Sequence, residues 1–330
     1  MTTLRPLVLL WFAWLIFGCA SPGPELERPG LAGGVPWTGK PVATAPDHFK
    51  FLVVTDRTGE HRHGVFAGAI DRINLLAPAF VVSVGDLVEG YTEDPGEIAA
   101  QWDEVDAMLE RLDAPFFYAA GNHDFSNEAM ARDWHARRGP SYYHFLYQDV
   151  LFLVLNSEIF PGVGRRDGVI GGPDVQADQL AYAREVLAAH RDARWTFVVI
   201  HRPLWDRREV HADWLAVEEW LGERPYTVLA GHRHRYTSQR RHDHRYVTLA
   251  TTGGGSRMRG IERGEFDHVA LVSVGDGEPV IANLMLDGIH GVDARSGSTR
   301  STPGARSGPA CGRPVTSSGS SPSLRTRKRA

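Results

Sequence analysis

Short apolar runs recur along the middle of the 330-residue chain, and they constrain its fold more than any other feature. Several are near-continuous stretches of four to six apolar residues, as in strands that are buried on both faces. The runs predict strands over residues 51–54, 80–84, 115–119, 150–155, 195–200, 226–230, 246–250 and 268–274. Most of these strands therefore need protein packed on both of their sides.

Helical patterns lie between the early strands. Apolar residues three and four positions apart predict helices over 64–76 and 98–112. A third helix is expected over 174–189, where Pro173-Asp174 provides a start signal. Beyond about residue 193 strands dominate. This alternation predicts an α/β fold in which the second half of the chain contributes more sheet than helix.

A residue of a metal-binding type follows each of five predicted strands. These residues are Asp56, Asp86 after Gly85, Asn122 within Gly121-Asn122-His123-Asp124, His201, and the pair His232 and His234 within Gly231-His232-Arg233-His234. Ligands of open α/β sheets collect at the carboxyl ends of the strands. One such residue alone is more often a cap or a turn residue, whereas the whole series predicts a shared metal site.

The series of motifs resembles that of the calcineurin-like metallophosphoesterases over about residues 48–285. The resemblance implies a two-sheet β-sandwich flanked by helices, which is a four-layer α/β fold. It also implies two divalent metal ions, of Mn, Fe or Zn, that activate a hydroxide to hydrolyse a phosphomonoester or phosphodiester. Two cations about 3.5–4 Å apart can bind phosphate oxygens and offset their charge, and Asp, His and Asn ligands suit these ions.

The same resemblance implies a role for each motif residue. The first ion would be bound by Asp56, Asp86 and His234, and the second by Asp86, Asn122, His201 and His232, so that Asp86 bridges the two. His123 would face the substrate beside Asn122 and protonate or stabilise the leaving oxygen. Asp124 would orient the ring of His123, although its position also suits a helix N-cap.

The first motif departs from the family pattern of Asp-x-His, because this chain reads Asp56-Arg57-Thr58. A hydroxyl is a poorer ligand than an imidazole, so the first site is expected to be weak or empty. His61 is the preferred substitute ligand, from a loop that turns at Gly59; the alternative is an exposed loop histidine. The Asp-Arg-Thr-Gly sequence also resembles a bacterial subgroup of the family. Arg57 would either bind a substrate phosphate or form a structural salt bridge.

Two rival functions stay open at this stage. The chain could be a catalytically weak pseudoenzyme that holds metal and recognises a phosphorylated envelope ligand, or a structural envelope lipoprotein. Thr58 favours the pseudoenzyme, while the presence of His123 and Asp124 opposes it. GNHD in place of GNHE argues against the Ser/Thr protein phosphatases, and the absence of Tyr three residues after Asp86 argues against the purple acid phosphatases.

The two ends of the chain differ from its middle. Residues 1–19 combine Arg5, an apolar run and Cys19, which fits a signal peptide with a lipobox. Residues 20–47 are a Pro/Gly-rich linker, 48–290 the expected domain, and 291–330 a basic tail that is expected to be disordered. We therefore expect an exported bacterial envelope protein held to the membrane by lipid on Cys19. A cleaved signal, giving a periplasmic or secreted protein, and an uncleaved anchor are the alternatives.

Charge is distributed unevenly along the sequence. The whole chain carries a formal charge of −4, the tail over 293–330 carries +7 and residues 1–18 carry +1, which leaves −12 for residues 19–292. A body this acidic is a poor general binder of nucleic acid, so no specific nucleic-acid partner is expected. A phosphoester can still bind where metal cations reverse the local field. The sequence gives no indication of oligomeric state.

Overall fold

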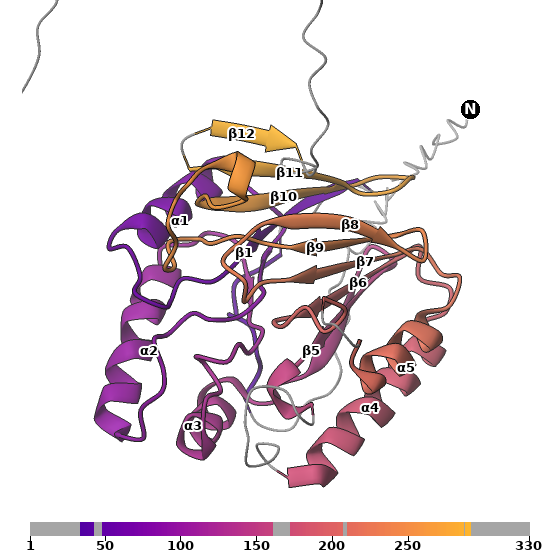
Figure 1. Cartoon of the computed structure of the whole chain (residues 1–330), viewed down its shortest axis with the longest axis horizontal. Helices are drawn as coiled ribbons and strands as arrows, with labels where there is room; N and C mark the ends of the chain where they lie inside the picture. The colour runs from indigo at the N-terminus through magenta and orange to yellow at the C-terminus, as the bar shows by residue number, and fades with distance from the viewer. Residues whose placement is uncertain (1–33, 43–47, 161–171, 207–209, 287, 292–330) are drawn as a thin grey trace, which may run out of the picture. The chain divides into compact units, whose positions relative to one another are not determined.

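The computed structural model describes residues 34–42, 48–160, 172–206, 210–286 and 288–291, and two six-stranded sheets form their framework (Figure 1). The predicted signal segment with Cys19 and most of the predicted tail lie outside these residues. Part of the predicted linker is described and packs on the domain. Trp37 is only 6% exposed, and the backbone N–H of Thr38 donates to the carbonyl of Phe116.

The first sheet has the order β12-β11-β10-β1-β2-β3. Its strands are β1 (Phe49–Val54), β2 (Val81–Ser83), β3 (Phe116–Phe117), β10 (His268–Val274), β11 (Val280–Met285) and β12 (Gly288–Gly291). β1, β2 and β3 are parallel, with Leu52 opposite Val81 and Val81 opposite Phe116, while β10 pairs with β1 in the antiparallel sense. The carboxyl ends of the first three strands therefore lie at the same edge.

The second sheet has the order β4-β5-β6-β7-β9-β8. Its strands are β4 (Tyr143–Tyr147), β5 (Val150–Leu155), β6 (Trp195–Ile200), β7 (Tyr226–Ala230), β8 (Thr237–Arg241) and β9 (His244–Thr248). β5, β6, β7 and β9 are parallel neighbours, and β4 and β8 pair with them in the antiparallel sense at the two edges. The carboxyl ends of β6 and β7 therefore also share an edge.

Neighbouring residues of a strand face opposite layers. In β1, Phe51 lies in the core between the two sheets, and Leu52 lies in the core between the first sheet and its helices. The ring of Phe51 lies 5.1 Å from that of Phe152 and 5.0 Å from that of Phe197, both in the second sheet. Because both faces of the strands are covered, their sequences are continuously apolar.

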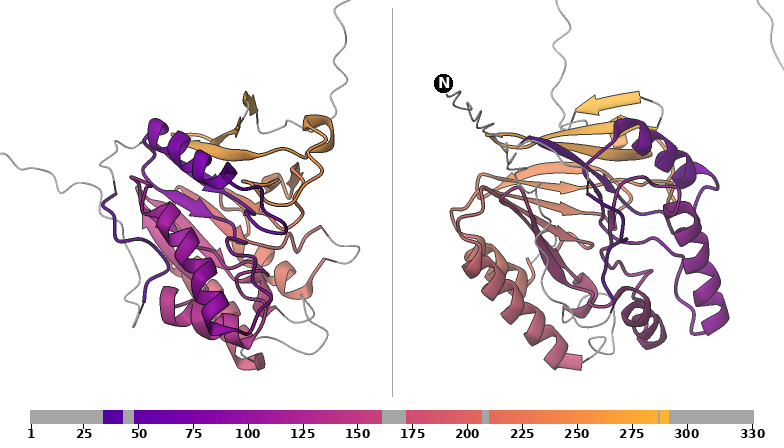
Figure 2. Two further views of the ribbon diagram at one scale, coloured as in Figure 1. Left: turned by 90° about the vertical axis from the view of Figure 1, so that its left-hand side faces the viewer. Right: turned by 180° about the vertical axis from the view of Figure 1, so that it is seen from behind.

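Helices cover the outer face of each sheet (Figures 1 and 2). α1 (Val65–Leu76), α2 (Pro95–Leu109) and α3 (Glu128–Arg138) cover the first sheet, and α4 (Gly172–Ala189) and α5 (Ala212–Leu221) cover the second. α2 begins after Asp94, which accepts a hydrogen bond from the N–H of Glu97 at 2.9 Å, with Pro95 in the first turn. The four-layer α/β sandwich is confirmed.

Several elements were not predicted, because their sequences carry weak patterns. α3 reads EAMARDWHARR and buries only Met130, Ala131 and Trp134, so its apolar stripe is thin. β8 reads TSQRR and is an edge strand with no buried residue. Polar and charged residues on an edge strand hinder pairing with other chains, and they remove the apolar pattern that identifies a strand.

No helix of the described residues is both long enough and apolar enough to cross a membrane.

Candidate metal centre

Loops from both sheets bring metal-ligating side chains together at the carboxyl ends of β1, β2, β3, β6 and β7. Two groups result, each with its possible ligand atoms within 4.8 Å of one another. One group holds Asp56, Asp86 and His234, and the other holds Asp86, His201 and His232. Asp86 belongs to both groups, so the arrangement has the form of a paired site with one shared carboxylate.

The group that contains Asp56 lies at the end of β1. Asp56 is fully buried, and its Oδ1 lies 3.2 Å from Nε2 of His234. The same oxygen accepts a hydrogen bond of 2.8 Å from the backbone N–H of His232, and the hydroxyl of Thr55 donates to Oδ2. These contacts fix the carboxylate with one oxygen toward the imidazole of His234.

The second group centres on His201, which follows β6 and is fully buried. Its Nε2 lies 3.2 Å from Oδ2 of Asp86 and 3.0 Å from Oδ1 of Asn122. The Nδ2 of Asn122 donates to the hydroxyl of Tyr91 at 2.9 Å, which fixes the amide with its oxygen toward His201. Asn122 thus joins this group, as the sequence predicted.

Backbone carbonyls fix the orientation of both central histidines. Nδ1 of His201 donates to the carbonyl of Val84 at 2.9 Å, and Nδ1 of His234 donates to the carbonyl of Gly255. A carbonyl can only accept, so Nδ1 carries the proton and Nε2 is presented to the carboxylates. Ligating histidines in proteins are held by the same kind of outer hydrogen bond.

Unusual backbone angles and glycines allow the groups to form. Asp86, His232 and His234 have φ of 62°, 71° and 48°, in the left-handed region that costs a non-glycine residue about 1–3 kcal/mol. A Cβ atom at Gly121 would lie 2.2 Å from Oδ1 of Asp86, and one at Gly231 would lie 2.3 Å from Oδ2 of Asp56. The glycines beside the motif residues therefore make room for the carboxylates.

The electrostatics of the cluster fit a cation site. Burial works to lower the pKa of His201, but the Asp86 carboxylate outweighs it and raises that pKa to about 9. Burial also works to lower the pKa of His234, but the hydrogen bond to Asp56 outweighs it and raises that pKa to about 9. In the absence of metal, a proton on Nε2 thus links His201 to Asp86 and His234 to Asp56. A divalent ion would bind to the same nitrogen and oxygen atoms. The buried mixture of carboxylate oxygen and imidazole nitrogen suits Mn, Fe or Zn.

His232 differs from the other two histidines. Burial, followed by the positive charges of His201 and Arg202, lowers the pKa of His232 to about 2. It is therefore a neutral imidazole at physiological pH, which is the form that binds metal. Its Nε2 lies 2.9 Å from Nη1 of Arg202.

Neither Thr58 nor the expected substitute His61 belongs to the first group. The hydroxyl of Thr58 is buried and has no hydrogen-bond partner among the described residues. His61 belongs to neither ligand group; its Nδ1 lies 2.8 Å from Oε1 of Glu89. The Glu89 carboxylate also accepts the backbone N–H of Gly59 and of His61, at 3.0 and 3.1 Å. The preferred role of His61 as a substitute ligand is corrected: Glu89 holds it in the loop.

The expected contact between Asp124 and the ring of His123 is also corrected. The Asp124 carboxylate lies in a buried nest of backbone N–H groups, from Asp86, Leu87, Val88 and Gly121 at 2.6–3.1 Å. Nδ1 of His123 donates instead to the carbonyl of Glu89 at 2.6 Å, and its ring meets that of Tyr91 edge-on. Asp124 therefore fixes the loop that carries Asp86. Burial and the charge of Asp86 raise the pKa of Asp124 to about 6.

Arg57 forms the structural salt bridge and does not bind at the ligand cluster. It is 4% exposed, donates to the carbonyl of Leu87 at 3.0 Å and pairs with Glu104 of α2. The arginine beside the ligands is Arg202, which the sequence reasoning missed. It pairs with Glu158 through two hydrogen bonds of 2.7 and 3.0 Å and also reaches His232. Its position directly after His201 was the available signal.

Comparison with known protein families agrees with this geometry. The family model described as calcineurin-like phosphoesterase matches residues 49–236, which include all six predicted ligands.

Curated relatives match over a shorter stretch. The human protein named serine/threonine-protein phosphatase CPPED1 is 30% identical over 149 residues, which are 42% of this chain and 44% of that protein. The bovine protein of the same name is 32% identical over 148 residues, again 42% and 44%. This chain thus matches less than half the length of these relatives.

Solved structures share the fold at low identity. A dimetal phosphatase from Danio rerio has a TM-score of 0.58 and 14% identity, over 74% of this chain and 96% of that chain. GAP50, described as the anchor in the inner membrane complex of Plasmodium, has a TM-score of 0.57 and 12% identity, over 74% and 88%. Identities this low show the fold alone.

Proposed function

Because the chain belongs to the calcineurin-like phosphoesterase family, we propose that it hydrolyses a phosphomonoester or phosphodiester at the cluster around Asp86. One observation carries the proposal: two groups of ligand atoms, drawn from both sheets, share the Asp86 carboxylate. A metallophosphoesterase needs such a pair of cation positions next to each other. The relatives named as protein phosphatases support phosphate ester chemistry in general.

We infer that the site would hold two divalent ions of Mn, Fe or Zn. One ion would be bound by Asp56, Asp86 and His234, and the other by Asp86, Asn122, His201 and His232. When bound, such a pair supplies charge stabilisation for the phosphate and an attacking water of lowered pKa. The first position is the weaker, because Thr58 stands where the family pattern has a histidine.

His123 would act on the leaving oxygen. Its Nδ1 proton is held by the carbonyl of Glu89, which leaves Nε2 to exchange a proton with the leaving group. The backbone N–H of His123 donates to Oδ1 of Asp86 at 2.9 Å, so the proposed general acid is held next to the bridging carboxylate. The ring is partly exposed, so a substrate can reach it.

Arg202 would bind a phosphate oxygen in the place first considered for Arg57. Its guanidinium is partly buried beside His232, and Glu158 fixes its plane through a two-point contact. A fixed guanidinium binds phosphate with little further loss of conformational entropy. Arg202 would therefore contribute to substrate binding at the second ion.

A second candidate function rests on Thr58. Its buried and unpartnered hydroxyl favours a weakly catalytic protein that holds metal and recognises a phosphorylated envelope ligand. Such a binder has no need of an acid at His123. Metal-stimulated turnover decides between the two functions.

We also propose, from the sequence of residues 1–19, that the protein is exported and carries lipid on Cys19, and that its Asp-Arg-Thr-Gly motif places it in a bacterial subgroup. Partition of the full chain into a detergent phase, lost in Cys19→Ser, is the expected result. Equal partition of both proteins would contradict the anchor.

Hydrolysis of p-nitrophenyl phosphate and bis-p-nitrophenyl phosphate with added Mn²⁺ tests the proposed function. We expect metal-stimulated turnover that falls about 10²- to 10⁴-fold in His123→Ala, because a general acid contributes about that much. The control is His63→Ala, at an exposed histidine outside both ligand groups, which should keep full activity. Turnover that does not depend on Mn²⁺, or equal activity of His123→Ala and His63→Ala, would refute the assignment.

A further inference from the structure

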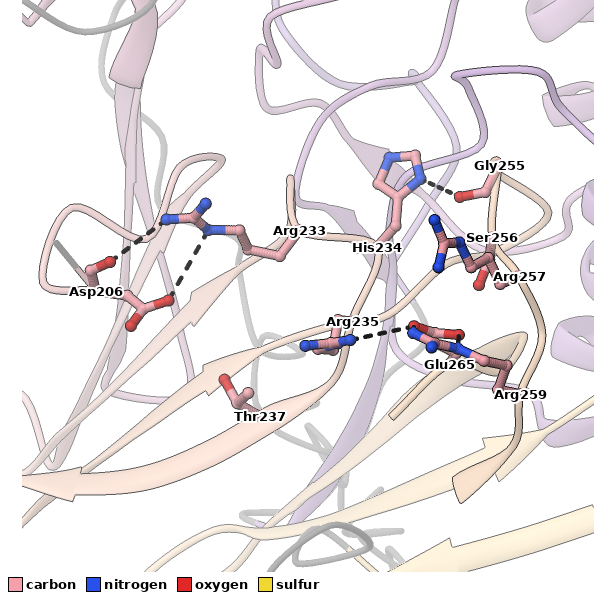
Figure 3. Close-up of a pocket in the computed structure, with 10 residues that line it drawn as sticks. All are labelled: Asp206, Arg233, His234, Arg235, Thr237, Gly255, Ser256, Arg257, Arg259 and Glu265. Atoms are coloured by element: carbon pink, nitrogen blue, oxygen red, sulfur yellow. Dashed lines mark hydrogen bonds and ion pairs between the residues drawn. The ribbon is translucent and has the colours of Figure 1, made fainter. Parts of the chain in front are cut away.

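A cavity of about 780 Å³ opens beside the metal centre. It is lined by Asp206, Arg233, His234, Arg235, Thr237, Gly255, Ser256, Arg257, Arg259 and Glu265. Figure 3 shows Arg233 with Asp206 at the left of this cavity, His234 and Arg257 to their right, and Arg235 with Glu265 below them. Four arginines against two carboxylates leave an excess of two positive charges, in a part of the chain that is acidic as a whole.

His234 joins the cavity to the metal centre. Its ring lines the cavity, and its Nε2 lies 3.2 Å from Oδ1 of Asp56. The carbonyl of Gly255, which orients that ring, belongs to the cavity wall as well. The cavity and the ligand cluster therefore share His234, so an anion bound in this basic space would lie next to the group that contains Asp56.

The arginines of the cavity are not equally available to a ligand. Arg233 lies 3.8 Å from Oδ2 of Asp206, and Arg259 and Arg235 both pair with Glu265. Arg257 is exposed and makes no hydrogen bond or ion pair with any other described residue. Its guanidinium therefore keeps all of its donors for a bound anion.

We propose that this cavity is an anion subsite that binds a second phosphate group of the substrate, with Arg257 as its main ligand. The proposal rests on the proposed function and narrows the substrate class to phosphoesters that carry two phosphate groups. A guanidinium forms two parallel hydrogen bonds with a phosphate, and an excess of two positive charges matches a phosphate dianion better than a carboxylate. Arg233 and Arg235 would add longer-range attraction from either side.

Paired substrates test the subsite. Fructose 1,6-bisphosphate and adenosine 3′,5′-bisphosphate are each compared with the corresponding monophosphate, fructose 6-phosphate and adenosine 5′-monophosphate, and with p-nitrophenyl phosphate. We expect at least one bisphosphate to have a kcat/KM about tenfold above that of its monophosphate. Arg257→Ala should remove this preference and leave p-nitrophenyl phosphate within twofold of the unmodified protein. Arg263→Ala, at an exposed arginine six residues further along the same connection between β9 and β10 but outside the cavity, is the matched control and should keep the preference.

Two outcomes separate the subsite from the proposed function. If p-nitrophenyl phosphate is hydrolysed but neither bisphosphate is preferred, or if Arg257→Ala and Arg263→Ala behave alike, the subsite is refuted and the hydrolase stands. If no substrate is hydrolysed, calorimetric titration of the full chain with the same pairs decides. Tighter binding of a bisphosphate that is lost only in Arg257→Ala supports the subsite without catalysis, and equal binding of each pair overturns it.

Discussion

The two ligand groups around Asp86 differ in how completely the protein surrounds them. His201 is fully buried, and Asn122 with its Tyr91 partner adds a further ligand on that side. On the other side His234 is 20% exposed, the buried hydroxyl of Thr58 has no hydrogen-bond partner among the described residues, and the His234 ring borders an open basic cavity. Under the proposed function, this difference predicts that the His201 group retains an ion more tightly, whereas the His234 group borders the proposed anion subsite.

The largest effect should come from the residue that both groups share. Asp86→Asn removes the bridging charge, so we expect metal content to fall toward zero and Mn²⁺-stimulated turnover to fall at least about a hundredfold, since loss of an outer partner alone costs about 10- to 100-fold. Elemental analysis and p-nitrophenyl phosphate kinetics measure this. Asp71→Asn, in an exposed salt bridge with Arg111, is the control and should change neither quantity. Retention of both ions in Asp86→Asn would contradict a bridged site.

Removal of one histidine from each side tests the asymmetry directly. We expect His201→Ala to lose the more tightly held ion and His234→Ala to lose the weaker one, each with an activity loss of at least about 10- to 100-fold, because loss of an outer partner alone already costs that much. Titration with Mn²⁺ after chelation distinguishes the two affinities, and His48→Ala, at an exposed histidine paired with Asp276, should behave as the unmodified protein. Identical titration curves for His201→Ala and His234→Ala would contradict a difference in ion affinity between the two groups.

A second fully buried histidine, His268, extends the comparison to stability. Its Nε2 accepts from the N–H of Ala250 at 3.0 Å and its Nδ1 lies 2.9 Å from Oδ1 of Asn283, with no carboxylate at either nitrogen. Burial therefore lowers the pKa of His268 to about 4, whereas carboxylates raise those of His201 and His234.

The sign of the pH effect follows from that pKa. Between pH 6.5 and 4 His268 is protonated in the unfolded chain but neutral in the folded chain. The free energy of unfolding therefore falls as the pH falls through this window. We expect the His268 contribution to reach about 3 kcal/mol in the free energy of unfolding, measured by urea titration. In His268→Gln, which cannot titrate, this part of the pH dependence should vanish. An unchanged slope in the variant would show that other groups cause it.

The smallest expected effect is a gain. Thr58→His restores the family pattern at the incomplete group, so we expect the affinity of the weaker ion to rise by about tenfold, or about 1.4 kcal/mol. Thr55→Ser, which keeps a hydroxyl beside Asp56, serves as a control for a change in the same strand end. The thermal midpoint of each variant shows whether the larger side chain fits. A folded Thr58→His with unchanged Mn²⁺ affinity would show that position 58 does not face the ion.

Much of the fold and the ligand series could be predicted, because both depend on patterns along the chain. Continuous apolar runs identify β1 and β6, and parallel neighbours in one sheet place their carboxyl ends at a common edge, so Asp56 and Asp86 had to come close. The structure adds that two edges, from two sheets, meet. The need for glycine at Gly231, next to Asp56 in space, and at Gly121, next to Asp86, follows only from the distances in the structure.

The residues that orient the ligands could not be predicted, because their roles depend on side-chain packing between distant elements. Arg57 pairs with Glu104 because α2 packs beside the first strand end, which no local pattern encodes. Asp124 stabilises backbone N–H groups nearly forty positions upstream along with its own loop. His123 and His61 both depend on Glu89, which carries no motif at all.

Glu89 links two parts of the molecule that have different tasks. Its side chain holds the 59–61 loop, and its own carbonyl holds the imidazole of His123. A shift of that loop would thus tilt the ring that serves the departing alcohol. Changes in the loop should then slow esters of strongly basic alcohols most and spare those of acidic phenols, which depart without help.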